Sequence, residues 1–308
     1  MAAVPPQKND GGDSSGRSFL VHGATVPVPR LKPGLYVVAT PIGNLADVTL
    51  RALYILAGAD AILAEDTRVS RNLLTRYGIR TPLSPYREHN AAEARPRALR
   101  RMAEGQALAL ISDAGTPLIS DPGYRLVAEA VSAGIPATTA PGASAVLAAL
   151  CVAALPTDRF FFEGFLPPKS AARRERINAL AAVPGTLVFY ESPGRLAEAL
   201  ADLALELGPR PAAVARELTK LHEEVRRGPL DALAGDYAAA GEPKGEIVIV
   251  VGGAEARDTV SEDALTGDLV EALASLSVKD AAAAVAAKHG LPRRQVYARA
   301  LKLAGARR

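Results

Sequence analysis

Polar and turn-forming residues are concentrated in a few short segments of this chain, and the densest of these segments reads LISDAGTPLISDPG. Within it, Asp113 supplies a hydrogen-bond acceptor, Gly115 lets a ligand approach the backbone closely, and Thr116 and Ser120 supply hydroxyl groups. Such a loop suits a polar, partly cationic small molecule.

The segment PGAS at residues 141–144 offers a second kind of binding group. It precedes the apolar run AVLAALCVAAL, which we expect to be a helix, so its free backbone N–H groups could bind a carboxylate. Val146 and Leu147 would then give the ligand an apolar wall. Further polar loops follow predicted strands: TPIGNLADVT, EDTR, YESPG, ARELTK and KGE. Any one loop could be a simple turn, but ligands of open α/β sheets bind at the carboxyl ends of strands, so together the loops indicate a site.

Several common kinds of site are not indicated. The chain has no G-x-G-x-x-G after a predicted strand and no G-x-x-x-x-G-K, which argues against dinucleotide and P-loop sites. Its four histidines are scattered and Cys151 is its single cysteine, so we expect no metal site and no intramolecular disulfide. We expect Cys151 to be a small buried side chain in a cytoplasmic protein. Pro141 and Pro156 bracket its apolar run, which is too short to cross a membrane.

The elements that must position these loops form two series. With 308 residues, 49% of them hydrophobic, the chain suffices for about two domains. In the first series, short apolar strands alternate with helical segments, which predicts a mostly parallel sheet covered by helices. These strands are expected at residues 35–40, 61–65, 107–112 and 136–140. The second series, from Asp158, adds strands at 159–165, 186–192, 212–219 and 246–253, with helices at 169–183 and 194–208.

We therefore expect four segments along the chain. They are a flexible tail at 1–33, a first α/β domain at 34–155, a second α/β domain at 156–253 and a helical extension at 254–308. In the extension, Ser277 and Asp280 have the spacing of a capping box.

Local signals punctuate the helices of the first domain. Asp121 can cap a helix whose first turn holds Pro122 and whose end is marked by Gly134. Pro96 fits poorly inside a helix, so we expect either a late helix start or a kink there.

The net charge of +3 is too small to identify a partner, but the basic residues cluster. Residues 278–308 contain eight Lys or Arg against one acid, and two more groups lie at Lys169–Arg176 and Arg68–Arg76. Such clusters suit phosphate contacts, although each could be a solvated helix face. The candidates for RNA contact are Arg71, Lys169, Arg173, Arg174, Arg293, Arg294 and position 298, expected as the arginine of YARAL.

The order of these segments resembles the tetrapyrrole methylase superfamily, and most closely its branch of ribosomal RNA ribose methyltransferases. The matching stretches run from GLYVVATPIGNLADVTLRAL through AEDTR, LISDAGTPLISDPGY, APGASAV, ALPTDRFFFEGFLPPK, FYES and ARELTK to GEIVIVVGG. They span residues 34–253 in order, whereas residues 1–33 have no counterpart.

The resemblance implies a homodimeric, two-domain α/β methyltransferase with a mostly parallel first sheet and a mixed second sheet. It would bind S-adenosylmethionine in the cleft between the domains, without a metal and away from membranes. Its substrate would be the 2′-hydroxyl of a decoding-site cytidine in 16S rRNA of the small ribosomal subunit, cytidine 1402 in the usual numbering of that RNA. The cofactor contacts carried over are Pro41, Asp113, Ala114, Gly115, Thr116, Ser120, Pro141, Gly142, Ala143, Ser144, Phe165, Tyr190, Ala215, Arg216, Gly245, Glu246 and Ile247.

A ribose hydroxyl is a weak acid, so a base or a cation should assist its attack. In AEDTR, Glu65 or Asp66 could accept the proton and Arg68 could bind phosphate or stabilise charge. The alternative is that Asp66 caps the next helix and Glu65 supports the helix dipole. On the catalytic interpretation, Asp66→Asn spares cofactor binding but slows methylation severely.

Two further residues are candidates. His89 is a second candidate base, although Asn90 beside it resembles a helix cap and makes a local structural role for His89 the favoured one. Glu191, in YES, could serve cofactor contact or packing between domains.

Two rival functions remain at this level. Methylation of a tetrapyrrole or of a modified protein residue would use the same cofactor loops but would not need the basic extension. The extension also reads as helix, turn and helix, so a nucleic-acid-binding regulator with a recognition helix near Arg293 is the second rival.

Overall fold

The first lobe is built on a sheet of five parallel strands. The structure, a computed structural model, describes residues 16–120, 123–254, 262–289 and 293–305. The strands are β3 (Gly34–Val38), β4 (Ala61–Ala64), β5 (Leu83–Pro85), β6 (Ala107–Ile111) and β7 (Ala137–Ala140), in the order β5-β4-β6-β3-β7. All four pairings are parallel. The predicted parallel sheet is therefore confirmed, and its strand ends meet at one edge.

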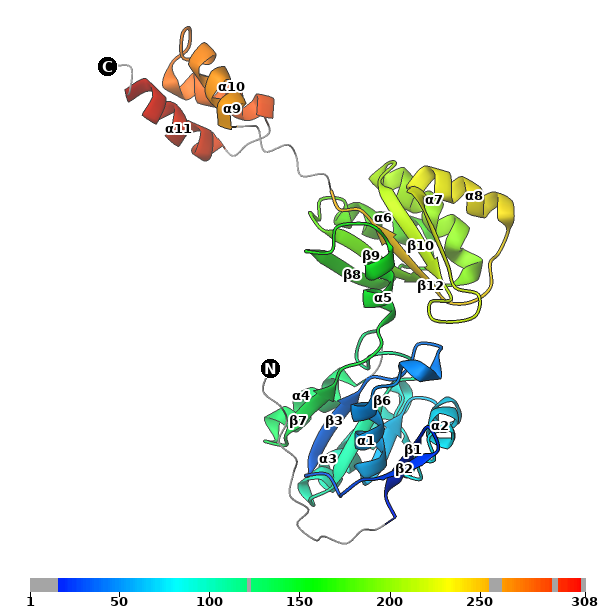
Figure 1. The fold of residues 1–308 in the computed structure, drawn as a ribbon. Coiled ribbons are helices and arrows are strands. Elements are labelled where there is room, and N and C mark those ends of the chain that lie inside the picture. Colours follow the sequence, from blue (N-terminus) through cyan, green and yellow to red (C-terminus); the bar gives the residue numbers. More distant parts are fainter. Residues whose placement is uncertain (1–15, 121–122, 255–261, 290–292, 306–308) are drawn as a thin grey trace.

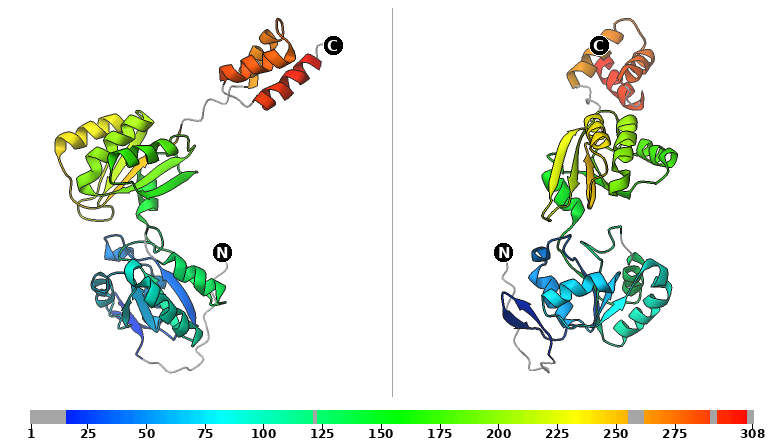
Figure 2. Two further views of the ribbon diagram at one scale, coloured as in Figure 1. Left: turned by 180° about the vertical axis from the view of Figure 1, so that it is seen from behind. Right: turned by 90° about the vertical axis from the view of Figure 1, so that its right-hand side faces the viewer.

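Helices cover both faces of this sheet (Figures 1 and 2). Apolar side chains of α1 (Leu50–Gly58) and α2 (Thr67–Arg76) pack on one face. Those of α3 (Ala91–Ala103) and α4 (Tyr124–Ser132) pack on the other. The short 3-10 helices η1 (Leu45–Asp47) and η2 (Glu88–Asn90) follow β3 and β5.

The hairpin at the start of the described chain corrects one expectation. Strands β1 (Ser18–Val21) and β2 (Ala24–Pro27) pair antiparallel, in a segment that we expected to be part of a flexible tail. Phe19 and Val28 are buried in the core beside α1, and Arg17 forms an ion pair of 2.8 Å with Asp60. The composition of this segment predicted flexibility, but apolar burial and this ion pair hold it in a defined structure.

Two helix signals of the first lobe can be compared with the structure. Pro96 lies inside α3, which begins at Ala91, so a late helix start is wrong; proline removes only one backbone donor there. Gly134, at φ 71°, follows the end of α4, as its helix-stop role requires. Asp121 and Pro122 lie outside the described residues.

The second lobe contains a five-stranded mixed sheet. Its strands are β8 (Phe160–Phe165), β9 (Thr186–Glu191), β10 (Pro211–Arg216), β11 (Glu224–Pro229) and β12 (Ile247–Val251), in the order β11-β10-β12-β9-β8. Only the pairing of β8 with β9 is parallel among these strands, so the mixed character is confirmed. One face packs against α6 (Ser170–Leu180), α7 (Leu196–Leu207) and α8 (Leu230–Ala240), and η3 (Pro193–Arg195) precedes α7.

Helix α5 (Ala145–Val152) joins the lobes in an unexpected way. We expected it in the first domain, but its buried Val146, Ala149 and Leu150 pack against β9, β10 and β12 on the other face of the second sheet. Figure 1 shows it beneath that sheet. The start of α5 therefore lies between the two lobes, and the body of the helix is part of the second lobe.

The C-terminal helices have a small core of their own. They are α9 (Glu262–Ala272), α10 (Val278–His289) and α11 (Arg293–Gly305), and they bury Leu269, Val285 and Val296. The N-cap half of the predicted capping box at α10 is present, because the Asp280 N–H donates to Ser277 Oγ at 3.2 Å, and the Ser277 hydroxyl also donates to the Asp280 carboxylate at 2.6 Å.

Candidate functional site

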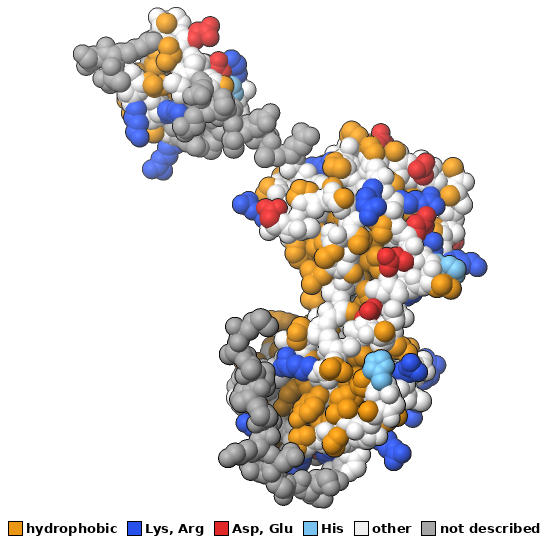
Figure 3. All heavy atoms as spheres, in the orientation of Figure 1, with side chains coloured by type: hydrophobic (Ala, Val, Ile, Leu, Met, Phe, Trp, Pro, Cys, Tyr) orange, Lys and Arg blue, Asp and Glu red, His pale blue; other side chains and the backbone are white. Residues whose placement is uncertain are grey.

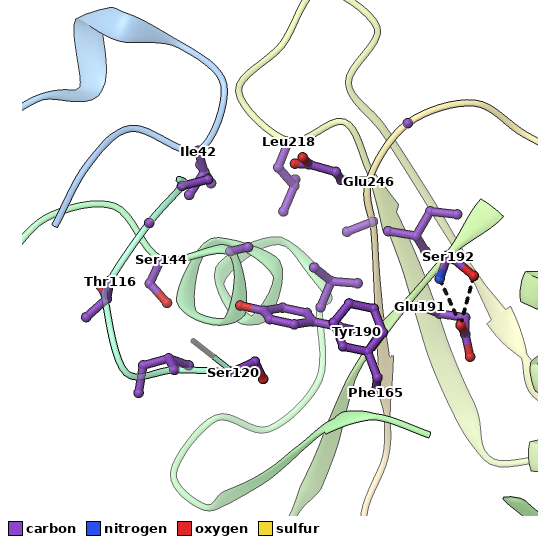
Figure 4. Close-up of a pocket in the computed structure, with 18 of the residues that line it drawn as sticks. Ile42, Thr116, Ser120, Ser144, Phe165, Tyr190, Glu191, Ser192, Leu218 and Glu246 are labelled. Carbon is purple, nitrogen blue, oxygen red and sulfur yellow. Dashed lines mark hydrogen bonds between the residues drawn. The ribbon is translucent and has the colours of Figure 1, made fainter. Parts of the chain in front are cut away.

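A cavity of about 400 Å³ lies between the two lobes, and we call it the donor cavity (Figure 4). From the first lobe and the start of α5 it is lined by Ile42, Ala114, Gly115, Thr116, Ile119, Ser120, Ser144 and Ala145. From the second lobe it is lined by Phe165, Tyr190, Glu191, Ser192, Pro193, Ala215, Leu218, Gly245, Glu246, Ile247 and Val248. The loops that the sequence singled out for their polar residues supply most of these walls.

Backbone pairing between two loops holds the first-lobe wall in place. Thr40, after β3, and Gly115, after β6, exchange N–H to carbonyl hydrogen bonds of 2.8 and 3.1 Å. Gly115 has φ 76°, and an added Cβ would come within 3.2 Å of Ile42, so a side chain there would push into the cavity wall. The Thr116 hydroxyl donates to the carbonyl of Ala143 at 3.1 Å and ties this loop to the start of α5.

The second-lobe wall is aromatic. The Tyr190 ring lies edge-on to Phe162 and Phe165, at centroid distances of 4.9 and 5.6 Å. A register shift between Phe162 and Gly164 in β8 marks a bulge, and bulges re-aim side chains. Gly164 (φ 81°) leaves room for Ser120, whose hydroxyl would lie 3.1 Å from an added Cβ. Figure 4 shows Tyr190 and Phe165 facing Thr116, Ser120 and Ser144 across the cavity.

Glu191 lines the donor cavity but is held by its own neighbours. Its carboxylate accepts hydrogen bonds from the Ser192 N–H at 2.8 Å and hydroxyl at 3.3 Å. Its second oxygen lies 3.2 Å from the Arg195 guanidinium, and its side chain is fully buried. These contacts give Glu191 a structural function at the cavity wall.

A second cavity of about 350 Å³ adjoins the first, and we call it the acceptor cavity. It is lined by Thr40, Pro41, Ile42, Gly43, Leu45, Val69, Ser70, Asn72, Leu73, Ile111, Ser112, Asp113, Ala114, Lys220 and Glu246. Ile42, Ala114 and Glu246 line both cavities. Two molecules bound side by side here would meet at these three residues.

Three charged residues form a cluster at this boundary. Lys220 Nζ lies 2.8 Å from Glu217 Oε1 and 3.1 Å from Glu246 Oε2. The hydrogen bond from Lys220 holds the pKa of Glu217 below its usual value. Burial alone would lower the pKa of Lys220, but hydrogen bonds to Glu217 and Glu246 raise it above its usual value, so Lys220 is a cation at neutral pH.

The AEDTR loop lies outside the walls of both cavities. Asp66 is the N-cap of α2 and accepts a hydrogen bond of 2.8 Å from the Arg68 N–H. Hydrogen bonds from the side chain and backbone of Arg68 hold the pKa of Asp66 far below its usual range, which makes Asp66 a weak base. Glu65 supplies a carbonyl oxygen to the Arg87 guanidinium at 2.7 Å. The contacts of Asp66 favour its structural interpretation.

The remaining cofactor candidates divide into three groups. Pro41 and Asp113 line the acceptor cavity, where Asp113 also accepts a hydrogen bond of 2.8 Å from the Asp66 N–H. Pro141, Gly142 and Ala143 lie beside the donor cavity but outside its lining. Arg216 points to Glu224 at 3.1 Å and to the Lys244 carbonyl at 3.0 Å, also outside the lining.

Some expectations about side chains near the site are wrong. Val146 is buried in the second-lobe core and Leu147 is exposed, so neither forms the expected apolar wall. That wall comes from Ile42, Ile119 and Leu218, which were not predicted from the sequence. The signal that could have found them is their place as apolar residues within the polar loops. Cys151 is exposed on α5 and not buried.

One residue of the basic clusters, Arg173, is not available for the RNA contact that the sequence predicts. Arg173 is buried, donates to Asp202 at 2.7 Å, and lies 3.4 Å from Glu198, so it is a structural arginine that RNA cannot reach. Arg174 pairs with Glu206 at the surface, and Arg176 pairs with Glu163.

A second correction concerns the last helix. The expected arginine at position 298 is wrong, because that residue is Ala298, whose uncharged side chain on α11 cannot pair with a phosphate. The arginine of YARAL is the next residue, Arg299, and its guanidinium donates to the Thr266 hydroxyl at 3.1 Å. Position 298 is therefore removed from the candidates for RNA contact.

The other basic candidates are distributed over several surfaces. Arg71, Lys169, Arg293 and Arg294 are exposed. His89, the second candidate base, is exposed in η2 and lies outside both cavities.

The described residues contain neither a metal-binding cluster nor a membrane-spanning helix. Within them, no group of three His, Cys, Asp or Glu side chains is arranged to hold a metal ion. None of the helices described is long and apolar enough to cross a membrane.

Comparisons with known proteins agree with this architecture. Residues 34–234 match the family described as tetrapyrrole (corrin/porphyrin) methylases, and residues 260–304 match the RsmI C-terminal HTH domain. A protein of Mesorhizobium japonicum named ribosomal RNA small subunit methyltransferase I is 54% identical over 279 residues, which cover 90% of this chain and 95% of that protein.

Solved structures share the fold at low sequence identity. A cobalt precorrin-4 methyltransferase of cobalamin biosynthesis has a TM-score of 0.54 and 19% identity, over 71% of this chain and 94% of its own. A uroporphyrin-III C-methyltransferase from Thermus thermophilus, crystallised with S-adenosyl homocysteine, has a TM-score of 0.50 and 21% identity, over 71% and 97%.

Proposed function

The chain is a methyltransferase of the tetrapyrrole methylase family, in the group named ribosomal RNA small subunit methyltransferase I, and we propose that it methylates a cytidine 2′-hydroxyl of 16S rRNA. The target would be the decoding-site cytidine 1402 in the usual numbering of that RNA. The observation that supports this proposal best is the pairing of two adjoining cavities between the lobes, the second of which presents the charged side chains of Asp113, Lys220 and Glu246. Such a pair can hold a methyl donor and an acceptor in contact.

The donor cavity fits S-adenosylmethionine, the methyl donor of this enzyme. When bound, this molecule supplies a methyl group on an activated sulfonium. The start of α5 at Ser144 offers N–H groups to a carboxylate, and the hydroxyl groups of Thr116 and Ser120 offer polar contacts. Ile42, Leu218 and the Phe165–Tyr190 pair give apolar surface to the remainder. The walls thus align the donor and exclude water, which is the main task in such a transfer.

The RNA would approach from the side of the acceptor cavity. Arg68, with a side chain 87% exposed, and Arg71 lie on α2, whose Val69, Ser70, Asn72 and Leu73 line that cavity. Both arginines are placed to contact phosphates near an entering ribose, and Lys169 and the exposed arginines of α11 add positive charge. A tetrapyrrole substrate would not require these groups.

We also propose that the enzyme is a homodimer in the cytoplasm, where small ribosomal subunits are found. Large apolar side chains are exposed on β8 and α5, namely Phe160, Phe161 and Leu147. Figure 3 shows hydrophobic side chains gathered on this face of the second lobe. An exposed apolar face of this kind is typical of a subunit interface.

The test is a map of ribose methylation in 16S rRNA from cells with and without the gene. We expect one 2′-O-methylcytidine to disappear at the decoding site when the gene is absent. In vitro, the purified enzyme should methylate small ribosomal subunits from cells lacking the gene and leave porphyrinoid substrates unmodified. An unchanged RNA map together with porphyrinoid methylation would refute the proposal in favour of its rival.

A further inference from the structure

The cluster of Glu217, Lys220 and Glu246 has geometry that the cofactor site alone does not explain. The loop after β10 supplies Glu217 and Lys220, and Glu246 immediately precedes β12. Besides the Lys220 ammonium, Glu217 Oε1 accepts a hydrogen bond of 3.0 Å from the Glu246 N–H. One carboxylate oxygen therefore fixes both the backbone of Glu246 and the cation that its side chain contacts.

The local backbone is strained to place this cluster. Glu217 and Thr219 have φ of 52° and 68°, a left-handed conformation that is unfavourable for residues other than glycine. Gly245, at φ 97°, would bring an added Cβ within 2.3 Å of the Glu217 side chain. Gly43, in the first lobe, would bring one within 2.5 Å of Lys220. Strain that the surrounding structure maintains in this way is typical of functional sites.

Glu246 occupies the boundary where the two reactants would meet. It lines both cavities together with Ile42 and Ala114, and it is the only one of these three that can ionise. Its side chain is 74% exposed, whereas that of Lys220 is 25% exposed. The carboxylate is thus open to an incoming hydroxyl group, and the cation behind it is held in place.

We propose that Glu246 is the catalytic proton acceptor for the attacking ribose hydroxyl and that Lys220 is the positioning residue that orients its carboxylate. This inference rests on the proposed function, since it assumes a hydroxyl as the acceptor. Glu217 anchors Lys220 and the backbone of Glu246 from the opposite side.

In the proposed step, the methyl group passes from the donor to the ribose oxygen and the hydroxyl proton passes to Glu246. The 2′-hydroxyl O–H bond breaks and its proton passes to the Glu246 carboxylate. The oxygen forms a bond to the methyl carbon, and the carbon–sulfur bond of the donor breaks with its electron pair remaining on sulfur. The charged groups facing this point are Lys220 and Glu217 in the cluster, Asp113 across the acceptor cavity and Glu191 in the donor cavity.

The test compares Glu246→Gln with Glu242→Gln, an exposed carboxylate of the same loop that lines neither cavity. Single-turnover methylation of small ribosomal subunits is measured from acid to neutral pH, and binding of S-adenosylhomocysteine is measured by calorimetry. We expect Glu246→Gln to lower the rate constant about 100-fold or more, with nearly unchanged affinity for S-adenosylhomocysteine, because a general base contributes 10²- to 10⁴-fold. The fall in rate at acid pH should also vanish, whereas Glu242→Gln should behave as wild type and Glu246→Asp should restore part of the rate.

Two results would overturn the inference. One is a wild-type rate and pH profile for Glu246→Gln. The other is a reduced rate that follows lost affinity for S-adenosylhomocysteine while the acid limb remains, since Glu246 would then only hold the donor. Absence of ribose methylation by the wild-type enzyme is a different result, which would refute the proposed function itself.

Discussion

Two strand-end loops of this protein carry a carboxylate beside a cation, yet the structure gives them different surroundings. After β4, Asp66 pairs with Arg68 at 2.6 Å on an open surface and caps α2. After β10, Glu217 and Lys220 pair at 2.8 Å between the lobes and reach Glu246 at the boundary of two cavities. Residue type alone does not distinguish these two loops, whereas their position relative to the cavities does.

The first experiment sets the two loops against each other and should give the largest effect. In Lys220→Met the Glu246 carboxylate loses its orienting cation, and we expect the methylation rate constant to fall about 10- to 100-fold.

In Asp66→Asn, by contrast, we expect methylation close to wild type, since asparagine also caps helices. This expectation differs from the severe loss of methylation that the sequence alone predicts for this variant, because Asp66 caps α2 and lines neither cavity. Single-turnover assays of both variants decide the matter, and the reverse ranking would return the catalytic function to the loop after β4.

The second experiment tests whether the cluster must be held in place. Gly245→Ala should displace the Glu217 side chain, while Gly105→Ala, at φ 88°, meets no atom within 4 Å. Both variants should lose about 1 kcal/mol or more of unfolding free energy, because alanine is strained at positive φ. Only Gly245→Ala should also lose activity, about tenfold or more, through misplacement of the cluster. Denaturant unfolding and rate measurements separate the two effects, and equal activities would show that the cluster tolerates displacement.

The third experiment examines the aromatic wall of the donor cavity. We expect Phe165→Ala to weaken binding of S-adenosylhomocysteine about tenfold, within the range for loss of one aromatic contact. Tyr297→Ala, at an exposed aromatic residue on α11 outside both cavities, is the matched control. Calorimetric titration provides the measurement, and equal affinities for the two variants would remove Phe165 from the site.

The fourth experiment tests whether Arg68, after β4, contacts phosphates of the RNA. We expect it to give the smallest effect. Arg68→Ala should weaken binding to the small ribosomal subunit by only a few-fold and leave the rate constant at saturating substrate unchanged. Each lost phosphate contact lowers the slope of log affinity against log salt by about 0.7 to 0.9. Filter binding at several salt concentrations measures this slope, and a salt-insensitive affinity in the wild type would contradict the expected phosphate contacts.

The architecture followed from the sequence because its signals are local. The apolar strands, the caps at Asp66 and Ser277 and the helix stop at Gly134 depend on neighbouring residues, and all appear in the structure. Loop chemistry likewise placed Thr116, Ser120 and Ser144 in one cavity. For these three residues, residue type and position at a strand end were sufficient to predict a place in the cavity.

Features that depend on distant partners were not predictable in this way. Arg173 reads as one more basic residue in KSAARRERINAL, and only Asp202, on another helix, shows that it is buried. The loop ARELTK indicated a site, but the position of Lys220 in it depends on Gly43, from the other lobe, which lies against the Lys220 side chain. The packing of α5 on the second sheet depends on β9, β10 and β12, which all lie later in the chain.

Helix α5 contacts the donor cavity with its first turn and the second sheet with its body, and this has a mechanical consequence. Its first turn touches the donor cavity while its body is fixed to the second sheet, so a molecule seated against Ser144 also braces the loop around Thr116 against that sheet. Occupancy should therefore stiffen the connection between the lobes at residues 141–144 and slow proteolysis there.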